Sequence, residues 1–124
     1  MIERLIDSVI LIDHLNGVAE ATRFIVALNP LETAISVITR AEILAGLHKE
    51  GQAAVTPLLD QYQLLIIDKP IADLAAQLRR KYGWKLPNAF QAALAQHHKT
   101  RLTTRNTKDF DPKKHAFVEI PYTL

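Results

Sequence analysis

Short apolar runs rich in Leu, Ile and Val alternate along this chain with longer segments whose apolar residues recur at helical spacing. The runs are typical of strands and lie at 4–7, 33–37, 64–68, 101–104 and 116–120. The segments between them predict helices at 9–17, 18–28, 38–51, 52–62 (interrupted near Pro57), 71–83 and 87–98. Strands that alternate with helices indicate an α/β fold, in which helices cover both faces of a mainly parallel sheet.

The length of 124 residues fits a single domain spanning 1–124, which can bury a core without disulfides or a structural metal. The chain has no Cys, which excludes disulfides, cysteine-ligated zinc and thiol catalysis and favours a reducing cytoplasm. Its longest unbroken apolar run, 24–28, is far too short to cross a bilayer, and its first residues do not resemble a signal peptide. We therefore expect a cytoplasmic protein without a membrane partner.

Charge is distributed unevenly along the chain. Residues 1–78 contain five Lys or Arg and ten Asp or Glu, whereas residues 79–114 contain two acids, Asp109 and Asp111. The bases of 79–114 number ten: Arg79, Arg80, Lys81, Lys85, Lys99, Arg101, Arg105, Lys108, Lys113 and Lys114. A basic surface beside an acidic cluster suits a polyanion held near a metal ion, although a solvated face without a partner has the same composition.

Polar side chains follow several of the predicted strands. In parallel α/β sheets, ligands bind beyond the carboxyl ends of the strands, where side chains distant in sequence meet. The candidates at this edge are Asp7 and Ser8 after the first strand, Glu42 one turn into the helix after the second, Asn106 and Asp109 after "RLTT", and Asn88 near a helix start. We expect three acids and an amide among them to converge there.

Acids gathered at one edge repel one another unless a cation lies among them. Oxygen-only ligands suit Mg²⁺ or Mn²⁺, which can activate a water and hold a phosphodiester for cleavage. Each residue also has a purely structural interpretation. Asp7, Ser8 and Asn88 could cap helices, Glu42 completes a Thr-x-x-Glu capping box, and Asn106 and Asp109 are common turn residues.

Four motifs, "LIDSVILIDHLNG", "SVITRAEILAGL", "LPNAFQAALAQ" and "LTTRNTKDF", occur in an order and spacing that resemble PIN-domain toxins of the VapBC toxin–antitoxin type. The resemblance covers essentially the whole chain. It implies a three-layer α/β/α sandwich with a mainly parallel central sheet. It also implies an endoribonuclease that depends on Mg²⁺ or Mn²⁺, is usually a homodimer or a toxin–antitoxin hetero-oligomer, and is held silent by a cognate VapB-like antitoxin.

The same resemblance assigns roles to individual residues. The family's acids, which bind metal and catalyse, fall on Asp7, Glu42, position 88 and Asp109, with Ser8, Thr104 and Asn106 in support. Asp13 matches a common "LID" pattern that we interpret as structural. RNA contacts are expected from Arg79, Arg80, Arg105 and Lys108, and an antitoxin groove from Val9, Leu15, Leu44 and Leu47, which could equally be core residues.

Asn88 is where this chain departs from the family, which has Asp at the corresponding position. Asn caps a helix about as well as Asp, and its amide oxygen can still bind a metal, but it supplies no charge. Two unit charges about 4 Å apart interact by roughly 4 kcal/mol at an effective dielectric of about 20. Loss of part of this interaction in the transition state should lower the rate of turnover. Two explanations of Asn88 remain: this chain is an engineered inactive toxin, or it is a natural variant. The otherwise intact motifs favour the first explanation.

A rival hypothesis from another class is a non-catalytic PIN-like module that binds antitoxin or RNA without cutting, and Asn88 favours it. A phosphate-receiver domain would need adjacent acids after the first strand, which "DSV" at 7–9 does not provide.

Overall fold

A five-stranded sheet, with all strands parallel, lies at the centre of the computed structural model, which describes residues 1–124. Its order is β3-β2-β1-β4-β5. The strands are short: β1 Arg4–Ile6, β2 Thr33–Ser36, β3 Gln63–Leu65, β4 Arg101–Thr103 and β5 Val118–Glu119. The register pairs Leu5 with Ala34 on one side and with Leu102 on the other. The predicted parallel α/β fold is therefore confirmed.

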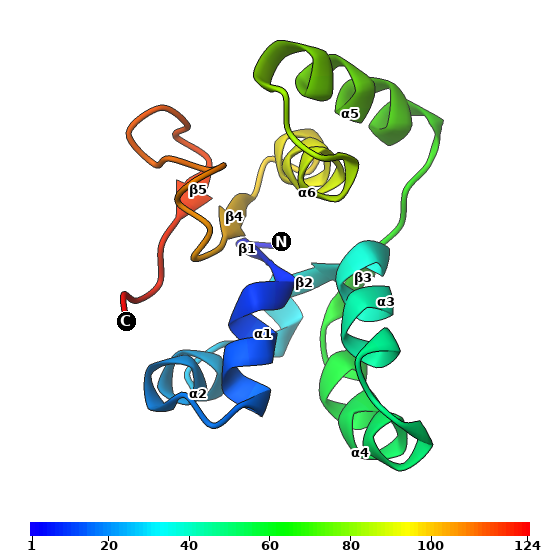
Figure 1. Cartoon of the computed structure of the whole chain (residues 1–124), viewed down its shortest axis with the longest axis vertical. Coiled ribbons are helices and arrows are strands. Elements are labelled where there is room, and N and C mark those ends of the chain that lie inside the picture. The colour runs from blue at the N-terminus through cyan, green and yellow to red at the C-terminus, as the bar shows by residue number, and fades with distance from the viewer.

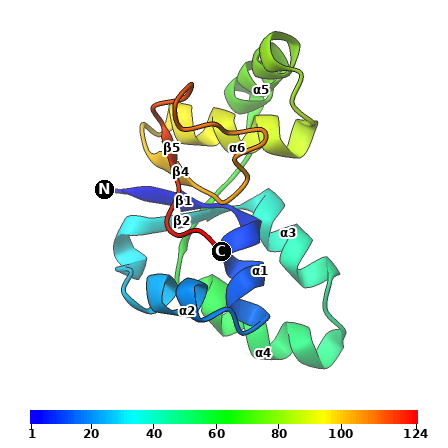
Figure 2. The same ribbon diagram turned by 60° about the vertical axis from the view of Figure 1, so that its left-hand side comes forward.

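Helices cover the sheet on both faces (Figures 1 and 2). One layer holds α5 (Lys69–Tyr82) and α6 (Leu86–His97). The other holds α1 (Ser8–Leu15), α2 (Ala19–Val26), α3 (Val37–Ala45) and α4 (Lys49–Asp60), and a short 3-10 turn, Pro30–Glu32, precedes β2.

Alternation along the strands divides the core between these two layers. Leu5 and Ala34 pack in the cluster under α5 and α6, while their neighbours Ile6 and Ile35 pack in the cluster that includes α1 and α3 residues. All four side chains are fully buried. Successive side chains of a strand point to opposite faces, so a sheet covered on both faces needs adjacent apolar residues, such as Leu5 and Ile6 in β1 and Ala34 and Ile35 in β2.

Capping residues fix where several helices begin. Asp7 caps α1, Ser36 caps α3 through the backbone N–H of Thr39, and Asp68 caps α5 through that of Ile71. Gly83 ends α5 in the left-handed conformation (φ 72°), where a side chain would be strained.

The region from 38 to 62 differs from the sequence prediction. The predicted helix 38–51 ends at Ala45, and a new helix, α4, begins at Lys49 and runs through Gly51 and Pro57 without interruption. Pro57 is tolerated because the carbonyl that it leaves without a partner, on exposed Ala53, can bond water.

The sequence did not predict the corner between α3 and α4, which is stabilised by the side chain of Gln52. The Nε2 of Gln52 donates to the backbone carbonyls of Leu44 and Leu47, at 2.9 and 3.0 Å. The carbonyl of Leu44 lies at the end of α3 and also accepts from the backbone N–H of Leu47, and the carbonyl of Leu47 lies just beyond the helix. The turn is therefore held by a side chain of α4 that lies five and eight residues away in sequence from the two carbonyls.

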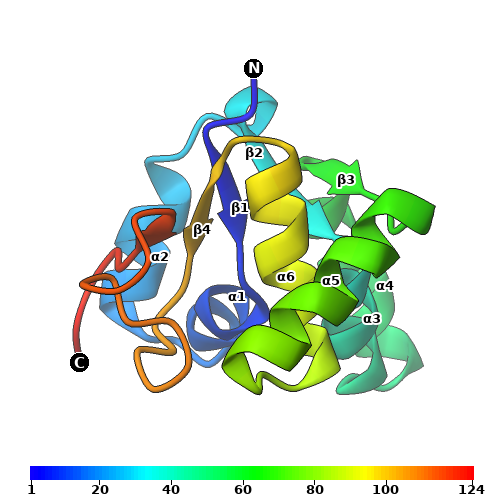
Figure 3. The ribbon, with the colours of Figure 1, turned by 90° about the horizontal axis from the view of Figure 1, so that it is seen from above.

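The carboxyl ends of β1 and β4 lie at one edge of the sheet (Figure 3). The start of α1 and the loop that follows β4, in orange, lie along this same edge. No helix of the structure is both long and apolar enough to span a membrane.

Candidate active site

Asp7 lies at the carboxyl end of β1 and is only 7% exposed. Three donors surround its carboxylate. The backbone N–H of Ser8 (2.9 Å) and the Nε2 of Gln91 (3.1 Å) donate to Oδ1, and the hydroxyl of Thr104 (2.8 Å) donates to Oδ2. Burying a carboxylate is costly unless such donors replace water. Asp7 is thus both the cap of α1 and a fixed, nearly buried negative charge.

Gln91 is a site residue that the sequence analysis missed. It lies on α6, is 1% exposed, and donates through Nε2 both to Asp7 and to the hydroxyl oxygen of Thr39 at 2.8 Å. Its Oε1 is buried and has no hydrogen-bond partner. A polar residue inside the apolar "AFQAALA" run was the signal that could have identified it.

A chain of hydrogen bonds links Asp7 to Asp109. Thr104 donates to Asp7, and the hydroxyl oxygen of Thr104 accepts from the backbone N–H of Asn106 at 3.0 Å. The side-chain amide of Asn106 in turn donates to Oδ2 of Asp109, at 3.0 Å. Asn88, from the start of α6, donates to the same oxygen at 3.0 Å. The structure therefore brings together residues that are up to about a hundred positions apart in sequence.

The Asn88–Asp109 contact depends on the amide. Its Nδ2 is a donor, whereas an aspartate at the same place would set a second negative charge against Asp109. In this chain, Asn88 therefore stabilises the arrangement without any metal ion.

Glu42 lies on α3 and keeps substantial exposure to solvent. Partial burial raises the pKa of Glu42, an interaction with the Ser8 hydroxyl opposes this rise, and the charge of Asp7 adds to it. Glu42 is thus close enough to Asp7 and Ser8 to feel both. Hydrogen bonds connect Asp7 with Asp109, whereas none joins Glu42 to either of them.

The capping-box interpretation of Glu42 is wrong. The residue that caps α3 is Ser36, whose hydroxyl oxygen accepts from the backbone N–H of Thr39 at 3.0 Å. Glu42 therefore lies in the second turn of the helix, where no free backbone N–H at the helix start is within its reach.

The donor set fits a hard cation of the Mg²⁺ type. The candidate metal ligands are all oxygen atoms: the carboxylates of Asp7, Glu42 and Asp109 and the amide oxygens of residues 88 and 106. No group of three or more acidic, His or Cys side chains lies close enough together to enclose a metal. Mg²⁺ does not need such a cage, because it usually binds one or two carboxylates and keeps several waters.

Asp13 anchors the site loop from behind. The guanidinium of Arg105 donates to both of its carboxylate oxygens, at 2.8 and 3.0 Å, and the hydroxyl of Tyr122 donates at 2.9 Å. The hydrogen bonds from Arg105 hold the pKa of Asp13 below its usual value. Burial, together with this carboxylate, raises the pKa of Tyr122 to about 12, so Tyr122 keeps its proton. The structural interpretation of Asp13 agrees with these contacts.

The four basic residues expected to contact RNA differ in their surroundings. Arg105 is engaged by Asp13, and Arg79 donates to the backbone carbonyl of Trp84 at 2.9 Å. Arg80 and Lys108 are exposed and make no ion pair. The latter two are therefore the better candidates to contact a polyanion, and an RNA role for all four stays a prediction.

An apolar groove adjoins Glu42 on the outer side of α1 and α3. It measures about 210 Å³, and its apolar walls are Ile12, Leu15, Ile43 and Leu47. Of the four groove residues expected from the sequence, Leu15 and Leu47 line it. Val9 and Leu44 instead pack against the core cluster, which is the alternative left open for them.

Comparison with known proteins places this arrangement in a family. The PIN domain family matches residues 4–115, and the chain belongs to that family. The match includes every candidate site residue from Asp7 to Asp109.

The individual relatives include a ribonuclease and chains from a toxin–antitoxin complex and from VapBC. Ribonuclease VapC19 from Mycobacterium tuberculosis is 32% identical over 81 residues, which are 64% of this chain and 65% of VapC19. A chain from a toxin–antitoxin complex of Klebsiella pneumoniae is 38% identical with a TM-score of 0.88, covering 98% of this chain and 100% of that one. DNA-bound VapBC from Salmonella typhimurium has a TM-score of 0.79 at 21% identity, covering 90% and 92% respectively.

The chain therefore spans about two thirds of the VapC19 sequence that it matches and all of the Klebsiella chain. The likeness to the Salmonella structure supports the fold alone. Together these matches confirm the VapC-like resemblance inferred from the four motifs.

Proposed function

We propose that this protein is a metal-dependent endoribonuclease and the toxin of a toxin–antitoxin pair. The observation that carries the proposal is the hydrogen-bonded series Asp7–Thr104–Asn106–Asp109 at the carboxyl edge of a PIN-domain sheet. The similarity to a ribonuclease, VapC19, supports the reaction type.

Asp7, Glu42, Asp109 and residue 88 would hold Mg²⁺ or Mn²⁺ through their side-chain oxygens. Such an ion supplies a water of lowered pKa and a positive charge for the phosphodiester oxygens. The chain's own residues fix the geometry, because Thr104 and Gln91 hold Asp7 and Asn106 holds Asp109. With Asn88 the site has one negative charge fewer than the family pattern, so activity should be weak.

A non-catalytic module is the second candidate, and one observation favours it. Asn88 satisfies Asp109 directly at 3.0 Å, so the site is stable without a metal. Such a protein would bind RNA or an antitoxin through the same surfaces and cleave nothing.

The partner proposed for the groove is an antitoxin. Two of the similar structures are described as a toxin–antitoxin complex and as DNA-bound VapBC. The groove beside Glu42 offers four apolar side chains, which suits the apolar face of an amphipathic segment. An antitoxin segment bound in the groove would lie next to the candidate active site and restrict access to it. The toxin and antitoxin would form a hetero-oligomer, which could include a toxin homodimer.

A cleavage assay separates the two candidates. RNA is incubated with the chain in Mg²⁺, in Mn²⁺ and in EDTA, beside the Asp7→Asn variant. The ribonuclease proposal predicts slow cutting that EDTA abolishes and that Asp7→Asn lowers at least about 100-fold, because Asp7 is the most fixed carboxylate. Cutting that survives EDTA would contradict metal dependence, and no cutting even by the Asn88→Asp variant would favour the non-catalytic module.

A further inference from the structure

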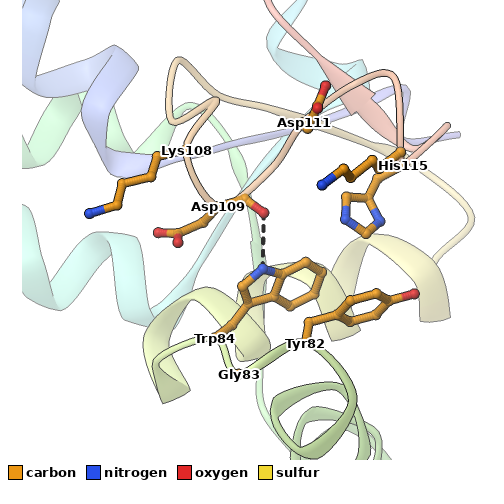
Figure 4. A pocket seen from close by; sticks show the side chains of 8 residues that line it. Tyr82, Gly83, Trp84, Lys108, Asp109, Asp111 and His115 are labelled. Carbon is orange, nitrogen blue, oxygen red and sulfur yellow. Dashed lines mark hydrogen bonds between the residues drawn. The ribbon is translucent and has the colours of Figure 1, made fainter.

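A second cavity of about 230 Å³ opens beside the acids (Figure 4). It lies between the turn that ends α5 and the loop after β4. The residues that line it include Tyr82, Trp84, Lys108, Asp109, Lys114 and His115. Asp109 belongs to both regions, because its carboxylate faces Asn88 and Asn106 while the residue also lines the cavity.

Aromatic rings form one wall of the cavity. Tyr82 stacks on Trp84 with 4.5 Å between ring centroids and is itself 41% exposed. The ring of His115 meets both at an angle, at 5.0 and 5.2 Å. Trp84 is 5% exposed, and its indole N–H donates to the backbone carbonyl of Asp109 at 2.9 Å (Figure 4). The aromatic wall is therefore tied directly to an acid of the candidate active site.

The lysines at the cavity form no ion pairs within the protein, whereas the carboxylates accept hydrogen bonds from other residues of the chain. Lys108 and Lys114 make no ion pair. The carboxylate of Asp111 accepts a hydrogen bond from the backbone N–H of Lys113 at 2.9 Å. The carboxylate of Asp109 accepts hydrogen bonds from the side-chain amides of Asn88 and Asn106. Lys114 thus lines the cavity with its aromatic wall, whereas the ammonium group of Lys108 points away from the rings, beyond the carboxylate of Asp109 (Figure 4).

We infer that this cavity binds one nucleotide of the RNA substrate, next to the phosphate that is cut. The inference rests on the proposed ribonuclease function. Single-stranded RNA is bound by aromatic rings that contact the bases and by Lys or Arg that contact the phosphates. The cavity is smaller than the pockets of about 300–1,000 Å³ that hold drug-sized ligands, so it suits the base of one nucleotide, with the sugar and phosphate at its mouth. Because Asp109 both lines this cavity and belongs to the candidate metal site, a nucleotide in the cavity would lie next to the phosphate that is cut.

Trp84 provides the readout, because it is the only tryptophan in the chain. The full chain is titrated in EDTA with AMP, UMP, GMP, CMP and a short RNA, and tryptophan fluorescence is followed. Absorption by the nucleotides is corrected with free N-acetyltryptophanamide. We expect saturable quenching by at least one nucleotide and by the RNA, since the ligand would lie against the Tyr82–Trp84 pair.

Matched variants locate the binding. Tyr82→Ala should weaken the apparent affinity roughly tenfold, and Tyr82→Phe should retain it, since the ring rather than the hydroxyl makes the contact. Lys114→Ala should weaken binding several-fold, and Lys49→Ala, on the opposite layer, should not change it. The thermal unfolding of each variant is measured alongside, so that a loss of fold is recognised.

The outcomes distinguish this inference from the function on which it rests. RNA cleavage without any quenching would overturn the nucleotide site and leave the ribonuclease standing. Quenching that Tyr82→Ala and Lys114→Ala leave unchanged would also overturn it, because the ligand would bind elsewhere. Quenching that the variants weaken, without cleavage, would support the nucleotide site and count against the proposed catalysis.

Discussion

At the scale of single residues, the contacts of Asn88 and Gln91 say more than their positions in the sequence. Both are amides on α6, and both donate to a carboxylate of the candidate site, Asn88 to Asp109 and Gln91 to Asp7. Asn88 lies where the resemblance to VapBC-type PIN toxins implies an acid, whereas Gln91 donates a hydrogen bond to Asp7. They therefore predict different effects on stability and on metal binding.

Asn88→Asp should destabilise the metal-free protein. It removes a hydrogen bond and puts two carboxylates at a contact that now measures 3.0 Å. Repulsion of roughly 4 kcal/mol at an effective dielectric of about 20 is reduced by solvent exposure, to about 1–2 kcal/mol of lost stability. Thermal unfolding in EDTA should show a Tm lower by about 4–8 °C, and Mg²⁺ should restore more stability to the variant than to the parent. An equal Tm in EDTA would contradict the contact.

Gln91 should act as a positioning residue for Asp7. Gln91→Leu removes the donor to Asp7 but also the unpartnered Oε1, so stability should change by less than about 1 kcal/mol. Mn²⁺ affinity measured by isothermal titration calorimetry should fall roughly tenfold or more, as is typical when a residue behind a metal ligand is lost. Gln96→Leu, the same change at an exposed position of α6, is the control. An unchanged Mn²⁺ affinity would mean that Gln91 only packs.

The sequence predicted two acids that the structure links, but not all of the residues that hold them. Asp7 and Asp109 were expected near the carboxyl ends of parallel strands, and hydrogen bonds through Thr104 and Asn106 connect them there. A role of Asp7, Glu42 and Asp109 as metal ligands stays a prediction. Gln91 was missed because helical periodicity places it among apolar residues of α6, where only the position of Asp7 in three dimensions shows its use.

At the scale of elements, Asp13 connects three segments of the chain. It lies on α1 and binds Arg105 of the site loop and Tyr122 near the C-terminus. Arg105 immediately precedes Asn106, which holds Asp109. The ion pair therefore positions the loop that carries one of the acids.

This connection predicts a pH-dependent stability. The pKa of Asp13 is lower in the folded chain than in the unfolded chain, so its contribution is present above the unfolded value, about 3.9, and is lost as the pH falls through the folded value. Asp13→Asn should cost about 1–3 kcal/mol in urea unfolding at pH 7 and progressively less below pH 4. Asp60→Asn, at an exposed ion pair with Arg40, should cost less than about 1 kcal/mol. A cost for Asp13→Asn that does not fall with pH would contradict this assignment.

Element order was predictable, and one corner was not. Alternating apolar runs located the strands and helices to within a few residues, because burial on both faces imposes those runs. The break after Ala45 was missed because Gly51 and Pro57, which usually end helices, lie inside α4. The contacts of Gln52 with the end of α3 involve side-chain geometry that no local pattern reveals.

At the scale of the whole molecule, the uneven charge predicts how RNA should bind. Arg80 and Lys108 belong to the basic segment 79–114 and make no ion pair. Each phosphate contact on a single strand contributes about −0.7 to the slope of log affinity against log salt. The Arg80→Ala/Lys108→Ala double variant should therefore flatten this slope by about 1.4 for a short RNA in EDTA.

The matched control for the salt experiment lies in the acidic part of the chain. Arg23→Ala/Lys49→Ala removes the same number and types of charge from 1–78. It should leave the slope nearly unchanged. Equal flattening by both double variants would mean that net charge, and not the basic segment, attracts the RNA.

RNA cleavage by Asn88→Asp most directly tests the proposal that this chain has a PIN-domain nuclease site lacking one carboxylate. Parent and variant are compared at equal concentration on the same RNA, in Mg²⁺ and in EDTA. Restoring the charge should raise the Mg²⁺-dependent rate roughly tens-fold, corresponding to about 2 kcal/mol, while EDTA abolishes cutting by both. Equal rates for the two proteins in Mg²⁺ would contradict the placement of residue 88 in the site.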